Sequence, residues 1–211
     1  MSGQRFLPES AAPYARHDRA GAGLSSAQAR QRFGRHADVG AAGERKFADL
    51  VKAAGLDVAY DVFYSLGLPS RGAGRQYNSD VDAALANGSH VVLVDVKRWK
   101  ANAFYWSISG LPFKGLTPLV MSGKWGLSAN MAAAVRKYRE ALPGVDVTAM
   151  VVFVPSGRGE LPVSVRWLRW PGGIRSFTSA NFAPEVRRRL GVERQPASAK
   201  VVGLLRSMQR G

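Results

Sequence analysis

Residues 90–96 contain a run that is apolar on both sides of an extended chain. The run, residues 91–94, reads Val-Val-Leu-Val. Successive side chains of a strand point to opposite faces of its sheet, so this run fits a central strand that is covered on both faces. The pair Asn87-Gly88 just before it is a strong hairpin signal, and residues 79–85 alternate on the other side of the turn. The chain is therefore expected to place a hairpin in a sheet with other elements packed against it.

Other segments carry the patterns of the elements that would surround this hairpin. Apolar residues recur at helical spacing over 40–54, before Gly55, and over 128–142, before Pro143-Gly144. The order helix, strand, hairpin, helix, strand indicates an α/β or α+β fold, with a mixed central sheet flanked by helices. The remaining expected elements are strands at 58–64, 147–154 and 163–170 and short basic helices at 184–190 and 199–208.

The chain divides into three regions by composition. Residues 1–39 are rich in Ala, Gly, Arg and Ser and are expected to form a basic, flexible N-terminal arm, with a short helix at 25–33. Residues 40–170 are expected to form the core, and residues 171–211 a basic C-terminal helical extension.

The composition removes several classes of protein. A chain of 211 residues with 46% hydrophobic residues can bury a sizeable core, which excludes wholesale disorder. The absence of cysteine excludes disulfide scaffolds, thiol nucleophiles and thiolate zinc sites, and His17, His36 and His90 share no motif spacing. No apolar run reaches the ~18–20 residues of a membrane span, and the first residues lack the apolar core of a secretory signal. The chain is therefore expected to be cytoplasmic, with no membrane partner.

Basic side chains outnumber acidic ones by 30 to 15, which gives a net charge of +15. The excess runs along most of the chain, with eight basic residues and one acidic residue over 97–140 and eleven and three over 158–211. Such a field attracts polyanions, with nucleic acid as the first expectation and anionic lipid or an acidic protein next. Residues 41–96 are the exception, with five basic and seven acidic residues. An acidic island in a basic protein indicates where a cation could bind.

Three charged residues of the expected hairpin carry the sharpest pattern. Asp82 lies near the start of the first strand, and Asp95 and Lys97 lie at the end of the second. Residues two apart in a strand share a face, so Asp95 and Lys97 project together, and the hairpin brings Asp82 close to them. Glu44, on the same helical stripe as Phe47, would face the sheet.

This set of residues suits a hard divalent cation. Two carboxylates suffice for Mg²⁺ when a phosphate supplies further oxygen ligands, and Mn²⁺ is expected to substitute. The metal would lower the pKa of a bound water and neutralise charge on a phosphate. Lys97 would orient or help deprotonate that water, or stabilise the developing oxyanion.

The ordered set resembles the PD-(D/E)xK nuclease superfamily and, more narrowly, the NERD (nuclease-related) domain. The likeness spans roughly residues 40–155 and rests on three short motifs: Gly43-Glu44, Asp80-Val81-Asp82, and Val94-Asp95-Val96-Lys97-Arg98-Trp99. It implies a restriction-endonuclease-like core and metal-dependent hydrolysis of DNA phosphodiester bonds. It also implies Asp82 and Asp95 as metal ligands, Lys97 as the catalytic lysine and Glu44 as the helix-borne acid.

The chain departs from the family pattern at three points. Ser79 and Val81, not proline, precede the first two aspartates, and Asp95 stands where the narrower family usually has glutamate. A glutamine common near the start of the following helix has no clear counterpart, and Ser128 or Asn130 would have to substitute for it. The pattern leaves open whether Asp80 or Asp82 is the metal ligand, and the spacing to the second motif favours Asp82.

Structural alternatives exist for most of these residues. Asp95 and Lys97 could form an ordinary strand-end ion pair, and Glu44 could be favoured in the first turn of a helix by the macrodipole. Trp99, Trp106 and Trp125 could stack on bases, although core packing is the commoner role of a tryptophan. Residues 187–189, three consecutive arginines, could be a phosphate clamp or a solvated helix face. The expected phosphate contacts are Arg98, Lys100, Lys114, Lys124, Arg71 and Arg75.

The sequence thus predicts a Mg²⁺-dependent deoxyribonuclease that holds DNA by its phosphates. An endonuclease is favoured over an exonuclease, but the sequence leaves both open. The alternative is a non-catalytic nucleic-acid-binding or assembly protein that keeps the nuclease fold. A third hypothesis is a subunit of a phage, plasmid or transposition complex whose basic surface meets an acidic protein. The sequence leaves open RNA against DNA, strand preference, and whether two chains pair as a homodimer to cut both strands.

Overall fold

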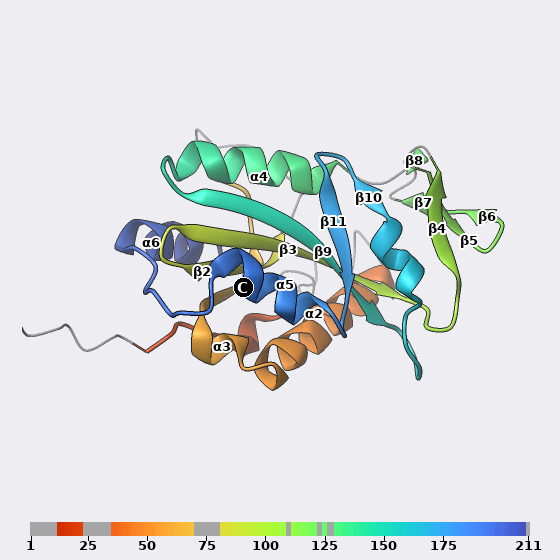
Figure 1. Ribbon diagram of the computed structural model, residues 1–211, viewed down its shortest axis with the longest axis horizontal. Helices are drawn as coiled ribbons and strands as arrows, with labels where there is room; N and C mark the ends of the chain where they lie inside the picture. Colours follow the sequence, from red (N-terminus) through yellow and green to blue (C-terminus); the bar gives the residue numbers. More distant parts are fainter. Residues whose placement is uncertain are drawn as a thin grey trace, which may run out of the picture.

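Strand β3 (His90–Trp99) lies inside a six-stranded sheet, as its apolar run predicts. The structure, a computed structural model, describes residues 12–22, 35–69, 81–108, 111–121, 124–125 and 129–209. The other strands of this sheet are β1 (Asp61–Leu66), β2 (Val81–Asn87), β9 (Asp146–Pro155), β10 (Arg169–Trp170) and β11 (Ile174–Thr178). Their spatial order is β1-β2-β3-β9-β11-β10 (Figure 1).

Long ladders join β3 to both of its neighbours. β2 pairs with it antiparallel, from Asn87 opposite His90 to Ala83 opposite Val94. β9 pairs with it parallel along its whole length, so the sheet is mixed, as predicted. Residues 91–94 are completely buried. Each fully buried Val or Leu stabilises a fold by about 1.5–3 kcal/mol, so this strand contributes strongly to the free energy of folding.

Helices cover both faces of the sheet (Figure 1). On one face, α4 (Asn130–Ala141) and α6 (Ala199–Met208) pack apolar side chains around Leu93. On the other face, α2 (Arg35–Ala53) and α5 (Phe182–Leu190) pack around Val92 and Val94. Gly55, at a φ of +64° that favours glycine, ends α2 as expected, and α3 (Leu56–Ala59) leads into β1. The predicted α+β fold, with a mixed sheet flanked by helices, is confirmed.

The hairpin turn forms where Asn87-Gly88 predicts it. Gly88 has a φ of +55°, a conformation that glycine adopts at little cost. The Asn87 side-chain amide has a second role, because it donates to the carbonyl oxygens of Leu190 and Glu193 and accepts from the backbone N–H of Gln195. These bonds tie the turn to the chain that leaves α5.

The strand expected over 163–170 is wrong for most of its length. Residues 163–167 form a 3-10 helix, η2 (Val163–Trp167), and only β10 follows as extended chain. The apolar residues there do not alternate in burial: Val163 is 64% and Trp167 61% exposed, whereas Ser164 and Val165 are buried. The sheet gains its outer parallel strand from β11 instead, which pairs with β9 and lies in the segment expected to be helical.

Residues 12–22 differ from the expectation of a flexible arm. They include a short 3-10 helix, η1 (His17–Arg19), and lie against β1. The Tyr14 ring stacks on Phe63 with centroids 4.8 Å apart, and the Tyr14 carbonyl accepts from the N–H of Val62 at 2.6 Å. This segment lies against the sheet because the aromatic ring of Tyr14 packs on apolar side chains at the edge of the sheet. The helix expected at 25–33 lies outside the described residues.

Two small sheets extend beyond the end of β3 (Figure 1). One consists of β4 (Tyr105–Ile108), β5 (Leu111–Lys114) and β6 (Thr117–Pro118), and the other of β7 (Val120–Met121) and β8 (Lys124–Trp125). In the part of the chain that the structure describes, no helix has both the length and the apolar character needed to cross a bilayer.

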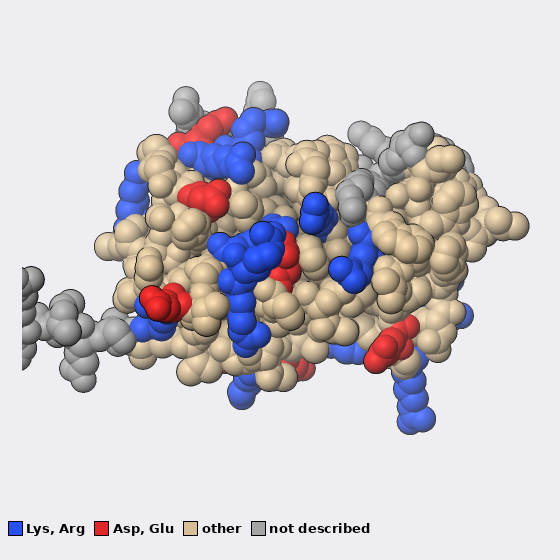
Figure 2. Space-filling view, in the orientation of Figure 1, with Lys and Arg blue, Asp and Glu red and all other residues tan. Residues whose placement is uncertain are grey.

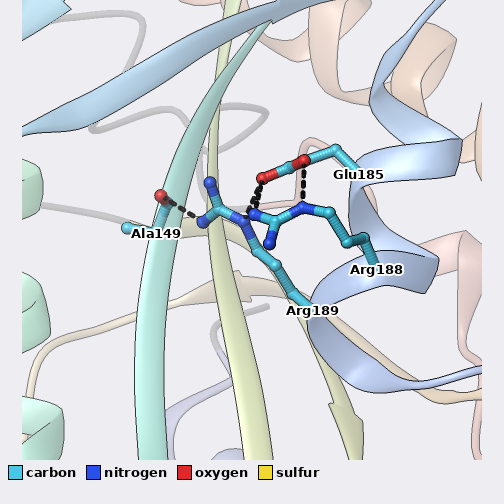
Figure 3. Close-up of polar contacts among 4 residues, drawn as sticks. All are labelled: Ala149, Glu185, Arg188 and Arg189. Atoms are coloured by element: carbon cyan, nitrogen blue, oxygen red, sulfur yellow. Dashed lines mark hydrogen bonds and ion pairs between the residues drawn. The ribbon is translucent and has the colours of Figure 1, made fainter.

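One carboxylate anchors the basic face of α5 (Figure 3). Glu185 accepts hydrogen bonds from Arg188 and from Arg189 Nε, and Arg189 in turn donates to the carbonyl oxygen of Ala149 in β9 at 2.8 Å. The bonds from Arg188, supported by those from Arg189, lower the pKa of Glu185 to about 2. The ionised form of this glutamate therefore stabilises the fold.

We expect the substitution Glu185→Gln to cost about 1 kcal/mol of stability at pH 7, a modest figure because Arg188 is largely exposed. Since the pKa of Glu185 is lowered in the folded state, its contribution is complete above the ordinary value of about 4.5 and disappears as the pH falls toward 2. Urea unfolding of both proteins at several pH values between 7 and 3 should show the two stabilities converging. A difference in unfolding free energy that stays constant across this pH range would contradict the prediction. The control is Glu160→Gln, which removes an acid at an exposed loop position.

Candidate active site

Strands β2 and β3 separate at the point where the acidic residues lie. Their last registered pair is Ala83 and Val94, so Asp82 and Asp95 face each other one position beyond the ladder. The Asp82 carboxylate fills the opening, because its Oδ2 accepts from the backbone N–H of Val96 at 2.5 Å. The side chain of one strand thus replaces the missing main-chain acceptor for the other.

The pairing of β2 with β3 brings three charged residues together at this end of the ladder. Val81 and Ala84 both belong to the core cluster beneath α4, although residues three apart in a regular strand point to opposite faces, so the alternation of β2 is interrupted at or next to Asp82. Asp95 and Lys97 are in phase with Leu93 of the same cluster. Lys97 Nζ donates to Asp95 Oδ1 at 2.6 Å. The pairing of the strands therefore puts Asp82 next to Asp95, and the alternation of β3 puts Lys97 on the same face as Asp95. The placement of Asp82 on that face stays a prediction.

Glu44 approaches the same point from α2 and is only 5% exposed. Its Oε2 accepts from the N–H of Gly21 at 2.9 Å and lies 3.2 Å from the hydroxyl of Ser65. Phe47 and Val51, on the same stripe of the helix, are fully buried, so the predicted orientation of Glu44 toward the sheet is correct.

Ser65 is a site residue that sequence reasoning missed. It has a φ of +53°, a left-handed conformation unusual for serine, and it is the one position of β1 that is skipped in the pairing with β2. Such a conformation costs on the order of 1 kcal/mol and persists only where the surroundings impose it. The one available signal was a hydroxyl residue in the otherwise apolar run from Val62 to Leu66.

These carboxylates and the lysine form one electrostatic unit. Burial, followed by the negative charges of Glu44 and Asp95, raises the pKa of Asp82 well above its ordinary range, against the opposing effect of Lys97. Burial acts to lower the pKa of Lys97, but Asp95 and Asp82 outweigh it and raise this pKa above the ordinary value. Three acids and one base thus share a poorly hydrated space, an arrangement typical of functional sites.

The site fits a cation that takes few protein ligands. Among the residues that the structure describes, no three Asp, Glu, His or Cys side chains lie close enough to hold a metal together. Asp82 and Asp95 each use one carboxylate oxygen, toward Val96 and Lys97, and neither second oxygen accepts a hydrogen bond from a described residue. Two available carboxylate oxygens suit Mg²⁺, which usually keeps several waters and takes phosphate oxygens as further ligands.

The expected phosphate contacts scatter around this site. Arg98 lies on the opposite face of β3 from Lys97, where its Cβ lies 3.2 Å from the place that a Cβ on Gly43 would occupy. Lys100 is exposed directly after β3, and Lys114 lies in the small sheet of β4 to β6. The side chain of Lys124 is outside the described part of the chain, as are Arg71 and Arg75, and so is Asp80 among the acids.

Trp99 and Trp106 each pack against other aromatic side chains. Trp99 packs against Tyr105 and Phe153, with ring centroids 4.6 and 4.5 Å apart. Trp106 stacks on Phe113 at 4.5 Å and donates its indole N–H to the carbonyl oxygen of Gly115. The alternative of core packing is therefore correct for Trp99, whereas Trp106 packs within the small sheet of β4 to β6. The Trp125 side chain lies outside the described residues.

Comparison with protein-family models gave no match for this chain, and neither the curated proteins nor the solved structures that were searched gave one.

The crowding of acids predicts that the substitution Asp82→Asn stabilises the protein in the absence of divalent cations. Asparagine keeps an acceptor for the Val96 N–H and removes a charge that burial, Glu44 and Asp95 all disfavour. Because the pKa of Asp82 is raised in the folded state, the penalty is absent below its ordinary value of about 4 and grows as the pH rises. Thermal melting in EDTA should show a gain of about 2–4 °C at pH 7 that vanishes near pH 4.

The matched control for this measurement is Asp49→Asn, which removes an exposed acid from α2 and should leave the melting temperature unchanged. A loss of stability in Asp82→Asn at neutral pH would show that its pairing with Lys97 outweighs the repulsion among the acids.

Proposed function

We propose that the chain is a metal-dependent nuclease that hydrolyses phosphodiester bonds of DNA at the site formed by Glu44, Asp82, Asp95 and Lys97. The observation that carries the proposal is the proximity of Asp82, Asp95 and Lys97 where β2 and β3 separate. A lysine beside two carboxylates that each keep an oxygen available is a set of groups suited to a metal and a phosphate.

The order of elements supports the proposal. Helix α2, strands β1, β2 and β3, helix α4 and strand β9 occur in this order along the chain, with α3 before β1 and the short strands β4 to β8 before α4. The first three strands are antiparallel, and β9 is parallel to β3. This is the succession of helix, strand, hairpin, helix and strand that the resemblance to the PD-(D/E)xK nucleases and the NERD domain implies. The charged residues lie at the motif positions named for that resemblance.

Each side chain has a distinct role in this proposal. Asp82 and Asp95 would hold Mg²⁺ through the oxygens that they do not use toward Val96 and Lys97. The bound ion would supply an activated water and neutralise charge on the phosphate. Lys97, kept in place by Asp95, would present its ammonium group to the oxygen that gains charge during the reaction. Glu44, held by Gly21 and near Ser65, would position the water or a second cation.

A second function is favoured by one observation. The net charge of +15 attracts a polyanion whether or not the site cuts it, as expected for a protein that keeps the fold but binds nucleic acid without cutting it. An assay of cleavage beside an assay of binding separates the two.

The test is nicking of supercoiled plasmid in Mg²⁺, in Mn²⁺ and in EDTA, by the wild type and by Lys97→Ala. We expect metal-dependent nicking by the wild type and a loss of about 10²-fold or more in the variant, because a charge that stabilises the transition state has been removed. Lys52→Ala, which removes an exposed lysine from the far end of α2, should cut like the wild type.

Duplex binding and thermal melting are measured on the same three proteins. Folded wild type that binds duplex but never nicks it, in any metal, would rule out the nuclease and leave the non-catalytic binding protein.

A further inference from the structure

A large cleft opens between α4, β9, β11 and α5, with a volume of about 1180 Å³. Glu44, Asp82, Asp95 and Lys97 are not among the residues that line it. The cleft borders residues 146–149 of β9, and Ala149 pairs with Leu93 of β3. Leu93 lies four positions before Lys97, which corresponds to about 13 Å along the strand. The cleft is therefore separate from the candidate active site.

The cleft exists because β9 and β11 pair over only part of their length. Their ladder begins at Met150 opposite Arg175, so residues 146–149 present an open edge. Arg139 of α4 donates to the Val147 carbonyl oxygen at 2.9 Å, and Arg189 of α5 donates to that of Ala149 at 2.8 Å. Because these acceptors are already in use, the edge is poorly suited to pairing with a further peptide strand.

Arginine is the dominant charged residue of the cleft. Its walls carry five arginines from three different elements and only two acids, Glu140 and Asp146. Figure 2 shows basic side chains gathered over α5 and α4 on this face of the molecule. The five are Arg136, Arg139, Arg175, Arg188 and Arg189.

Most of these guanidinium groups keep donors for a ligand. Arg136 and Arg175 are exposed, and their side chains make no hydrogen bond with any described residue. Arg188 and Arg189 are fixed by Glu185 before any ligand arrives (Figure 3). A guanidinium has five N–H donors, so Arg189, which uses two of them, retains three. An arrangement with donors already in position loses little entropy on binding.

We propose that this cleft binds the phosphate backbone of a nucleic acid, at a site distinct from the one that would cut it. The planar fork of arginine matches phosphate oxygens, and several such forks on two sides of a groove suit a chain of phosphates. Small-molecule pockets are mostly apolar and of ~300–1,000 Å³, whereas this cleft is larger and lined by cations. The overall charge of +15 points to the same class of ligand. The inference does not depend on cleavage.

The test compares two double variants that lose the same charge. Arg136→Gln with Arg175→Gln removes the two unbonded cleft arginines, and Lys52→Gln with Lys200→Gln removes two exposed lysines elsewhere. Binding of a fluorescein-labelled DNA duplex is followed by anisotropy in EDTA, over a series of salt concentrations. We expect the cleft variant to bind at least 10-fold more weakly near physiological salt and its salt dependence to fall by about two phosphate contacts. The lysine variant should stay within 2-fold of the wild type.

Equal loss in both double variants would overturn the proposal, since only net charge would then matter. Binding of vesicles with anionic lipid, lost in the cleft variant while DNA binding is unchanged, would overturn it in favour of a membrane surface. Lys97→Ala in the same assay separates this proposal from the proposed nuclease activity. If the protein is not a nuclease but the cleft binds DNA, Lys97→Ala and the wild type still bind the duplex. If the cleft does not bind DNA but the protein is a nuclease, the wild type still nicks plasmid when the enzyme is in excess.

Discussion

The position of β3 between β2 and β9 determines most of what this molecule can do. Burial of residues 91–94 on both faces fixes the strand in register, because a slip by one residue would exchange its two faces. The antiparallel ladder to β2 then sets Asp82 opposite Asp95, and the alternation of β3 sets Lys97 on the same face as Asp95. The hydrophobic pattern of one strand thus places charged side chains that make no contribution to the core.

The candidate site lowers the stability of the fold, whereas the core raises it. Asp82 lies in a gap of the sheet beside two other acids, and its hydrogen bond to the Val96 N–H and the nearby Lys97 offset this only in part. Ser65 holds a left-handed conformation next to Glu44. Local rules of burial and backbone geometry are broken together at one place, and in natural proteins such places are commonly functional.

Much of this fold could be predicted from the sequence because its signals are local. The hairpin followed from Asn87-Gly88, the central strand from residues 91–94, and α2 and α4 from helical spacing. The 3-10 helix at η2 was missed because apolar composition resembles a strand whether or not the side chains alternate in burial. β11 was missed because a short outer strand is defined by its partner, β9, which no local pattern reveals.

The charged residues of the site were predicted from the sequence, whereas the residues that hydrogen-bond to them were missed. Asp82, Asp95, Lys97 and Glu44 are ionisable residues at recognisable spacing, whereas Ser65 and Gly21 take part through backbone geometry that the sequence does not encode locally. The arginine cleft was equally hidden, because its members come from α4, β11 and α5 and meet only in the folded chain. The three consecutive arginines 187–189 offered the choice between a clamp and a solvated face, and Glu185 orders two of them.

In the proposed function, Asp82 and Asp95 form a binding site for a divalent cation at the end of the β2–β3 ladder. Titration of the protein with Mn²⁺, followed by the electron paramagnetic resonance signal of the free ion, tests it without any assay of activity. We predict saturable binding of Mn²⁺ that Mg²⁺ displaces and that Asp95→Asn abolishes, with Asp49→Asn behaving as the wild type. Binding that is absent in the wild type, or that persists unchanged in Asp95→Asn, would contradict the claim.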